Sequence, residues 1–197
     1  MLPWSQIIAE NVWWICAAIF MLIRWPHIRR AAREPAKLSQ PPASDVYLLR
    51  TGEVTFGVMP FVYILFKEPS FANYPWYPSF VVIGTLTFLF AIWMIHRAHR
   101  DLGRSFSYTL EIRDRQQVVD SGIYRYIRHP MYAAFLVWTA AQAMLLPNWM
   151  VGLCAPLLLV TLLAVRIPRE EQMMIDNFGD GYRNYMKRTA RLIPGVF

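Results

Sequence analysis

The sequence predicts an all-α, polytopic membrane protein with about five transmembrane helices, on three observations. Hydrophobic residues make up 56% of the 197 residues and charged residues only 17%, which is too apolar for an ordinary soluble domain of this size. The apolar residues form long runs, and nearly all Lys and Arg residues lie between these runs. The net charge of +7 therefore belongs to loops and a tail, which argues against a nucleic-acid partner.

The apolar runs define the expected spans, because a helix needs about 20 mostly apolar residues to cross a bilayer. We expect spans at residues 6–25, 46–66, 79–95, 131–146 and 149–165. The second run is the least regular, since Arg50 and Glu53 lie in its first turns, where they can pair on one helical face. The last two runs are separated only by Pro147 and Asn148, which predicts a tight antiparallel hairpin.

The basic residues predict the orientation of these spans. Eighteen of the twenty Lys and Arg residues fall between the first and second spans, between the third and fourth, or in the C-terminal tail. Arg50 lies at the same end of the second span, which leaves Lys67 on the other face. By the positive-inside rule, the basic segments and the C-terminus are expected in the cytoplasm and the N-terminus outside. The first run has no basic stretch before it and no cleavage site after it, so we expect a retained helix rather than a signal peptide.

The chain is expected to divide into two regions. Residues 1–95 hold the first three spans, and residues 96–197 hold a cytoplasmic loop, the helical hairpin at 131–165, and a cytoplasmic helix and tail. Cys16 and Cys154 each lie inside an apolar run, so neither a disulfide framework nor a metal site is expected. The sequence leaves the oligomeric state open.

A cluster of polar and aromatic residues precedes the fourth span. Pro130 suits the first turn of a helix, so His129 is expected at a helix N-terminus at the membrane face. Free backbone N–H groups and the helix dipole favour an anionic ligand there, and Arg125 and Arg128 add to the attraction. Tyrosine rings at positions 124, 126 and 132 accompany them. A basic membrane-interface collar with tyrosine anchors is the alternative interpretation.

A second polar segment follows the fifth span. Pro168 followed by acidic residues is expected to begin a fresh short helix, which ends at Phe178 and Gly179. Beyond it, Tyr182 and Tyr185 are three residues apart and can face the same side.

Glu170 and Glu171 allow two interpretations. They can compensate the helix dipole and pair with Arg166 or Arg169, or they can bind ribose hydroxyls or a substrate ammonium. Spacing alone does not separate the two.

Together the two segments resemble the isoprenylcysteine carboxyl methyltransferase and phospholipid methyltransferase group of integral membrane enzymes. That group has an Arg-His-Pro-x-Tyr box at the start of a transmembrane helix, a helical hairpin, a Glu-Glu pair, a Phe-Gly-x-x-Tyr-x-x-Tyr motif and a late proline. The matching stretches here are residues 128–132, 170–171, 178–185 and Pro194. The resemblance covers about residues 95–197. Ala134, where the group has glycine, and Pro168, just before the Glu pair, depart from the pattern.

The resemblance implies an S-adenosylmethionine-dependent membrane methyltransferase whose cytoplasmic cofactor pocket is formed by the C-terminal half. The residues it implies for cofactor binding are Gln116, Gln117, Val118, Val119, Tyr124, His129, Pro130, Met131, Tyr132, Glu170 and Glu171. Arg166 and Glu170 are implied at the reaction centre, and Arg166, Tyr182 and Tyr185 beside a lipophilic acceptor. No metal is implied. A prenylated-cysteine carboxylate is the first candidate acceptor, and the amine of phosphatidylethanolamine or another small lipophilic thiol, amine or acid is also compatible.

Two other functions remain open at this point. A membrane sterol or steroid reductase that uses NADPH is similar over the same C-terminal region, although such chains are usually longer and the Glu pair favours the methyltransferase. A non-enzymatic membrane scaffold would bind no cofactor, but it would not need this density of titratable and aromatic residues beside the hairpin.

Overall fold

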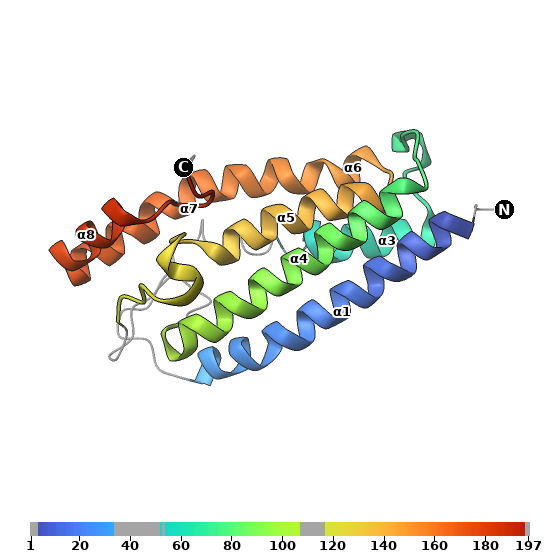
Figure 1. Cartoon of the computed structure of the whole chain (residues 1–197). Helices are drawn as coiled ribbons and strands as arrows, with labels where there is room; N and C mark the ends of the chain where they lie inside the picture. The colour runs from blue at the N-terminus through green and yellow to red at the C-terminus, as the bar shows by residue number, and fades with distance from the viewer. Residues whose placement is uncertain (1–3, 34–51, 53, 107–116, 196–197) are drawn as a thin grey trace.

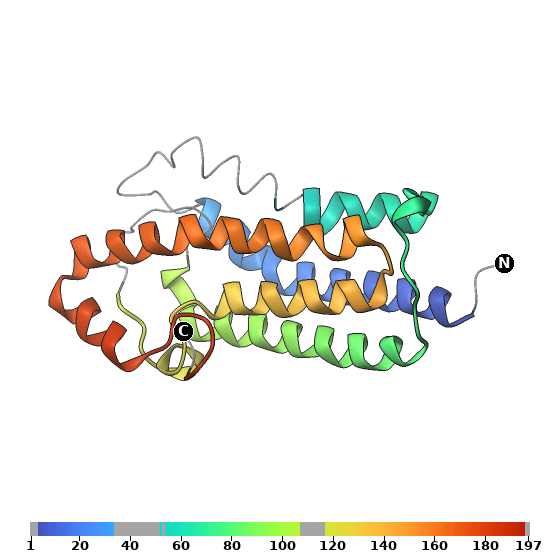
Figure 2. The same ribbon diagram turned by 90° about the horizontal axis from the view of Figure 1, so that it is seen from above.

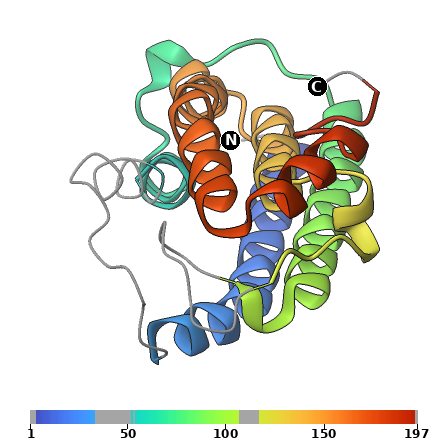
Figure 3. The ribbon, with the colours of Figure 1, turned by 90° about the vertical axis from the view of Figure 1, so that its left-hand side faces the viewer.

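The computed structural model describes residues 4–33, 52, 54–106 and 117–195, and the regular structure within these ranges is helical. Its long helices are α1 (Trp4–Arg33), α4 (Ser79–Leu102), α5 (Pro130–Leu145) and α7 (Cys154–Phe178). They lie side by side along one axis (Figure 1), and the end-on view shows α5 in the middle, between α1, α4 and α7 (Figure 3).

Shorter helical segments connect and complete this bundle. They are the π-helix η1 (Val54–Val58), α3 (Met59–Phe66), η2 (Ser70–Ala72), η3 (Gly103–Ser105), η4 (Gly122–Arg125), α6 (Trp149–Gly152) and α8 (Asp180–Arg188). The expected all-α class is confirmed.

Within the part of the chain that the structure describes, three helical segments are long and apolar enough to cross a bilayer: Trp4–Arg33, Ser79–Leu102 and the combined stretch Trp149–Phe178. The chain is therefore a multi-pass integral membrane protein. Phe56–Phe66 and Pro130–Leu145 are apolar but shorter. At 1.5 Å per residue, the 16 residues of α5 extend about 24 Å, against about 30 Å of bilayer hydrocarbon. The expected count of five crossings depends on these two shorter helices.

The core is built around α5. Trp138 packs edge-on against Phe20 of α1 and Phe88 of α4, with ring centroids 4.4 Å apart in both pairs. One turn later, the fully buried Gln142 accepts hydrogen bonds from the indole N–H groups of Trp13 and Trp138 and donates one to a backbone carbonyl of α6. These bonds satisfy a polar side chain among apolar helices, and they tie α5 to α1 and α6.

The two ends of the bundle differ in charge. At the end that holds the turn between α5 and α6, Lys67 pairs with Glu10 of α1, and the Asn148 side chain caps the first turn of α6. At the opposite end, Arg33 closes α1 and Arg100 lies in the last turn of α4, and α8 lies at this end as well (Figure 1). The separation matches the grouping of basic segments expected from the sequence.

The expectation of a fresh helix at Pro168 was wrong, because α7 runs unbroken from Cys154 to Phe178. The residues of α7 that are buried at four-residue intervals on both sides of the proline are Leu159, Leu163, Ile167 and Glu171. Pro168 itself is exposed, so its ring lies away from this inward face. Pro168 has no backbone N–H to donate to the helix. We infer that α7 stays continuous there because its buried face packs against the bundle on both sides of the proline.

The other differences concern helix ends. The first span continues past residue 25 to Arg33, the third continues past 95 to Leu102, and Leu153 separates α6 from α7. As expected, Pro130 begins α5, and α7 ends before Gly179, whose φ of 54° favours glycine. The expected Arg50 and Glu53 pair, with residues 46–51 of the second span, lies outside the described residues.

Candidate functional site

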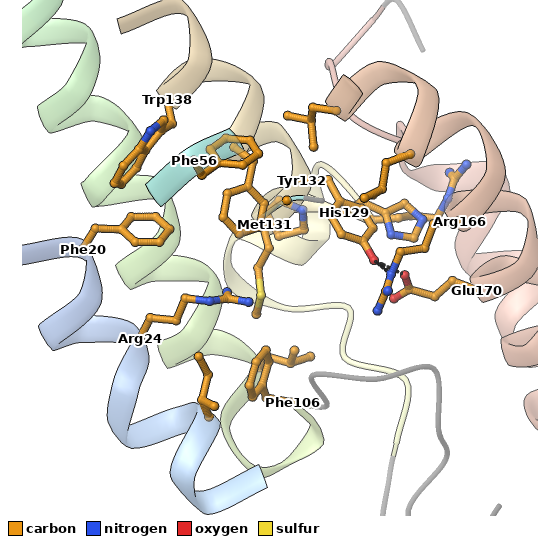
Figure 4. A pocket seen from close by; sticks show the side chains of 18 of the residues that line it. Phe20, Arg24, Phe56, Phe106, His129, Met131, Tyr132, Trp138, Arg166 and Glu170 are labelled. Carbon is orange, nitrogen blue, oxygen red and sulfur yellow. Dashed lines mark hydrogen bonds between the residues drawn. The ribbon is translucent and has the colours of Figure 1, made fainter. Parts of the chain in front are cut away.

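A cavity of about 1060 Å³ lies among the helices, and Figure 4 shows some of the side chains that line it. One part of its wall is aromatic and apolar, formed by Trp13, Trp14, Phe20, Phe56, Phe61 and Trp138. The other part is polar, formed by Tyr124, Arg128, His129, Tyr132, Arg166, Glu170, Tyr182 and Tyr185. The volume lies at the upper end of the range for small-molecule sites. A cavity with one apolar and one polar part of its wall suits an amphiphilic ligand together with a polar ligand.

Tyr132 joins Arg166 and Glu170 in one hydrogen-bonded group. The Arg166 Nε donates to the Tyr132 hydroxyl at 2.7 Å, and that hydroxyl donates to the Glu170 Oε2 at 2.7 Å. The ring of His129 stacks on Tyr132 with centroids 5.5 Å apart (Figure 4). Tyr132 and His129 come from the start of α5, and Arg166 and Glu170 lie one turn apart on α7. The group therefore holds a cation and a carboxylate in fixed positions on the polar wall.

Glu171 lies behind this wall, at the centre of a buried ion cluster. Its Oε1 accepts from the Arg128 Nε at 2.9 Å and lies 3.4 Å from the His129 Nε2. Its Oε2 accepts from the Arg191 Nε at 3.0 Å. The Arg128 and Glu171 side chains are 7% and 4% exposed, so water barely reaches the pair. The cluster ties α7 to the start of α5 and to the tail.

The tail after α8 returns to the start of α5 (Figure 2). Ala190 forms a parallel bridge with Ile127, the backbone N–H of Arg128 donates to the Ala190 carbonyl at 2.8 Å, and that of His129 donates to the Arg191 carbonyl at 3.1 Å. The Arg128 guanidinium also donates to carbonyls at the end of α8. The sequence led us to expect that Arg128 helps to attract an anionic ligand. In the structure its guanidinium instead binds the Glu171 carboxylate and backbone carbonyls of the protein itself.

Gly122 and Asp101 position η4 against α4. Gly122 has a φ of 60°, and a Cβ at this residue would collide with the Asp101 carboxylate. The N–H of Ile123 donates to that carboxylate at 2.8 Å. From the other side, the Tyr185 hydroxyl donates to the Tyr124 carbonyl at 2.7 Å. The segment is held between α4 and α8, which places Tyr124 in the cavity wall.

The tyrosines from η4 and α8 remain neutral phenols at ordinary pH. Burial, with a further contribution from the Glu170 carboxylate, raises the pKa of Tyr124 well above its usual range. Burial likewise raises the pKa of Tyr182, next to the Glu171 carboxylate, and the pKa of Tyr185. Each phenol can therefore donate or accept a hydrogen bond at the polar wall.

Most of the residues expected at the site converge on this cavity. Its wall includes Gln117, Val118, Val119, Tyr124, His129, Pro130, Met131, Tyr132, Arg166, Glu170, Tyr182 and Tyr185. Gln116 lies outside the described residues, and Glu171 lies behind the wall. Residues from 117 to 185 thus share one cavity, as binding of a common ligand would require.

The sequence interpretation missed the contribution of the N-terminal helices. Arg24 of α1 lines the cavity, and its guanidinium carbon lies 5.2 Å from the ring centroid of Phe135 and 5.9 Å from that of Phe106. In the sequence, Arg24 counted only as a charge that fixes topology. Its position in the last turns of an apolar run was the available signal, because ionisable residues inside spans usually face a protein interior or a cavity.

Comparisons with known proteins agree on one family. Residues 80–176 match the model of the isoprenylcysteine carboxyl methyltransferase (ICMT) family. A protein-S-isoprenylcysteine O-methyltransferase of Schizosaccharomyces pombe is 36% identical over 94 residues, which cover 47% of this chain and 40% of that protein. Protein-S-isoprenylcysteine O-methyltransferase B of Arabidopsis thaliana is 32% identical over 96 residues, with 48% and 49% covered.

Among solved structures, the eukaryotic intramembrane Ras methyltransferase ICMT aligns with a TM-score of 0.54. The alignment covers 81% of this chain and 55% of that chain at 19% sequence identity, so it shows a shared fold. The chain spans about half the length, or less, of the curated relatives named here. The matched stretch, residues 80–176, contains the α5 and α7 residues of the polar wall and is similar to the isoprenylcysteine carboxyl methyltransferase family.

Proposed function

We propose that this chain is an S-adenosylmethionine-dependent methyltransferase acting on a lipophilic acceptor at the membrane, most directly the carboxylate of a prenylated cysteine. The observation that carries the proposal is that the family-matched residues of α5 and α7 form the polar wall of a cavity whose other wall is aromatic and apolar. The names of the relatives support the reaction class. The reductase alternative has no support among those relatives.

The polar wall offers a donor set that fits S-adenosylmethionine. The first turn of α5 has no side-chain cap, so its N–H groups at Met131 and Tyr132 suit an amino-acid carboxylate. The Glu170 carboxylate suits an ammonium group or a ribose hydroxyl. The ring of Tyr124 and the adjoining stretch 117–119 suit the adenine. Bound S-adenosylmethionine would supply a methyl group that is already activated on a sulfonium.

The protein's own task is then alignment. In transfer to a carboxylate, an oxygen–methyl bond forms, the carbon–sulfur bond breaks, and its electron pair stays on sulfur, so no proton has to move. Arg166, held by Tyr132, would orient the anionic group of the acceptor, with Tyr182 and Tyr185 beside it. The aromatic wall would hold the lipophilic part and exclude water. No general base is needed for this acceptor.

The cavity's polar wall lies toward the end of the bundle where the basic residues gather. The positive-inside rule would place this end in the cytoplasm, the C-terminus with it and the N-terminus outside. In this orientation a soluble cofactor enters from the cytoplasm and a lipophilic acceptor enters laterally from the bilayer.

Calorimetric titration of the detergent-purified protein with S-adenosylmethionine tests the cofactor. We expect binding that Glu170→Gln and His129→Ala weaken, while Gln172→Ala, an exposed change on the same helix, leaves it intact. Because His129 also contacts Glu171, the folding of that variant has to be checked first. A well-folded protein that binds NADPH but not S-adenosylmethionine would overturn the proposal in favour of the reductase, and one that binds neither would favour the scaffold.

Transfer of a labelled methyl group identifies the acceptor. An S-prenylated cysteine with a free carboxylate and phosphatidylethanolamine should be compared in the same vesicles. Label on the cysteine compound supports the proposed substrate. Label on the lipid alone would keep the methyltransferase but change its acceptor.

A further inference from the structure

The apolar part of the cavity ends inside the bundle. Among the described residues of α1, those that line the cavity run from Ile28 to Trp13, which is about 22 Å along the helix axis at 1.5 Å per residue. On α5 and α3, the lining residues farthest from the polar wall are Trp138 and Phe61. One turn beyond Trp138 lies the fully buried Gln142. Packed side chains from three helices therefore close this end.

Aromatic rings form the closed end. Trp13 and Trp14 meet edge-on with ring centroids 5.2 Å apart, and Trp14 meets Phe61 of α3 in the same way at 5.3 Å. The Trp13 indole donates to the Gln142 Oε1 at 3.3 Å, and the Trp138 indole donates to the same oxygen at 3.2 Å. Hydrogen bonds thus fix two of the rings, and Trp14 continues the row from Trp13 to α3.

The side of the cavity between α1 and η1 faces outward. Met21 of α1 and Val58 of η1 both line the cavity, yet they are 49% and 52% exposed, so in a bilayer they would also face lipid. Ala17 lines the cavity between Met21 and Trp14, and its small side chain fills little of this path. An apolar chain can therefore enter sideways from the bilayer and lie along α1 with its end against Trp14.

We propose that Trp14 is a specificity-determining residue that stops the prenyl chain of the acceptor and sets the longest chain that the cavity can hold. The proposal rests on the proposed function and deepens it, because it adds chain length to the description of the substrate. Trp14 lies outside residues 80–176, the stretch that matches the family model. It is also only partly buried, whereas Trp13 is 2% exposed and bonded to Gln142, so Trp14 can be replaced with less damage to the core.

Direct binding to the full chain in detergent, without cofactor, tests the role of Trp14. The probes are N-acetylcysteines that carry an S-geranyl, S-farnesyl or S-geranylgeranyl chain, so that each is one isoprene unit longer than the last. Longer chains also partition more strongly into micelles, and each Kd is therefore compared between variants for the same probe. Trp14→Ala opens the closed end, and Ala17→Phe fills the path about one turn nearer to the polar wall.

Trp93→Ala is the matched control. Trp93 lies on α4, is 52% exposed, stacks on the Phe90 ring and does not line the cavity. The control therefore removes the same side chain without changing the length of the cavity. Calorimetry with S-adenosylmethionine on every variant reports the fold and the cofactor site separately.

We expect Trp14→Ala to bind the geranylgeranyl probe at least about tenfold more tightly than the wild type does, because more of the chain is buried once the end is open. Its Kd for the geranyl probe should not change, since the shorter chain does not reach Trp14. Ala17→Phe should act in the opposite direction, weakening the geranylgeranyl probe at least about tenfold and the geranyl probe least. Trp93→Ala should match the wild type for all three probes.

Equal changes at all three chain lengths in Trp14→Ala or in Ala17→Phe would overturn the role of Trp14 and leave the methyltransferase standing. No change in either variant would overturn it as well, because the chain would then leave the cavity between α1 and η1. The two variants test the role independently, so misfolding of one leaves the other decisive. A wild type that binds cofactor but none of the probes would overturn the acceptor class together with this role, and absence of cofactor binding would show failure of the proposed function itself.

Discussion

Arg128 and Glu171 form a buried ion pair in which the Arg128 Nε lies 2.9 Å from the Glu171 Oε1. The pair joins the residue two positions before α5 to a residue inside α7, and Arg191 of the tail binds the other carboxylate oxygen. The neighbouring residues His129 and Glu170 line the cavity. A salt bridge between the residue that precedes His129 and the residue that follows Glu170 therefore joins the start of α5 to α7, the two helices that carry most of the polar wall.

Glu171→Gln should strongly destabilise the fold. The substitution keeps the shape but leaves two guanidinium groups without their shared carboxylate, and breaking a buried pair from one side typically costs about 3–5 kcal/mol. The free energy of unfolding in mixed micelles measures the effect. Asp180→Asn is the control, because the Asp180 and Arg183 pair lies on the surface, with the Asp180 side chain 88% exposed, and should matter little. Equal, small effects of both changes would contradict a structural role for the buried cluster.

Tyr132→Phe should weaken ligand binding more than it weakens the fold. It removes the hydroxyl that accepts from Arg166 and donates to Glu170, so both charged groups lose a fixed partner. Hydrogen bonds to charged groups are worth about 1.5–3 kcal/mol, which corresponds to a rise of about tenfold or more in the Kd for S-adenosylmethionine. Calorimetry measures it, with Tyr126→Phe, a change at an exposed tyrosine, as the control. An unchanged Kd in a folded variant would show that the bridge serves another purpose.

The sequence predicted the helical class and most of the polar residues that line the cavity, because both depend on local patterns. The apolar runs marked the helices, and the His129-Pro130 and Glu170 motifs marked the polar wall. Two features depend on tertiary packing and were missed. Pro168 signals a helix start locally, and only the inward packing of α7 on both sides of it shows that the helix continues. Arg24 is distant in sequence from every motif, and its place in the wall follows from how α1 packs against α5.

Gly122→Ala should shift η4 and lower stability, whereas Gly103→Ala should cost only backbone strain. The two glycines have φ values of 60° and 56°, so both substitutions carry a similar left-handed penalty of about 1 kcal/mol or more. Only at Gly122 does the added Cβ also meet the Asp101 carboxylate, while nothing lies within 4 Å at Gly103. We expect Gly122→Ala to unfold more readily and to bind S-adenosylmethionine more weakly, since Tyr124 moves with η4. Indistinguishable variants would rule out Asp101 as the support of this segment.

The raised pKa values of Tyr182 and Tyr185 predict a loss of stability at alkaline pH. In the unfolded chain a tyrosine titrates near about pH 10, and in the folded protein burial raises its pKa above that value. The protonated form is the one the fold favours, so its contribution is fully present below about pH 10 and is lost as the pH rises toward the folded-state pKa. The thermal midpoint should therefore fall as the pH rises from about pH 10 to about pH 12. The thermal midpoint of Tyr185→Phe should be lower than that of the wild type at neutral pH, because the variant loses the hydrogen bond to the Tyr124 carbonyl, but it should decline less steeply as the pH rises. Tyr77 is exposed, so the midpoint of the control variant Tyr77→Phe should follow that of the wild type. A wild-type midpoint that stays constant over this range, or an equally steep fall in Tyr185→Phe, would mean that these buried phenols do not govern the alkaline transition.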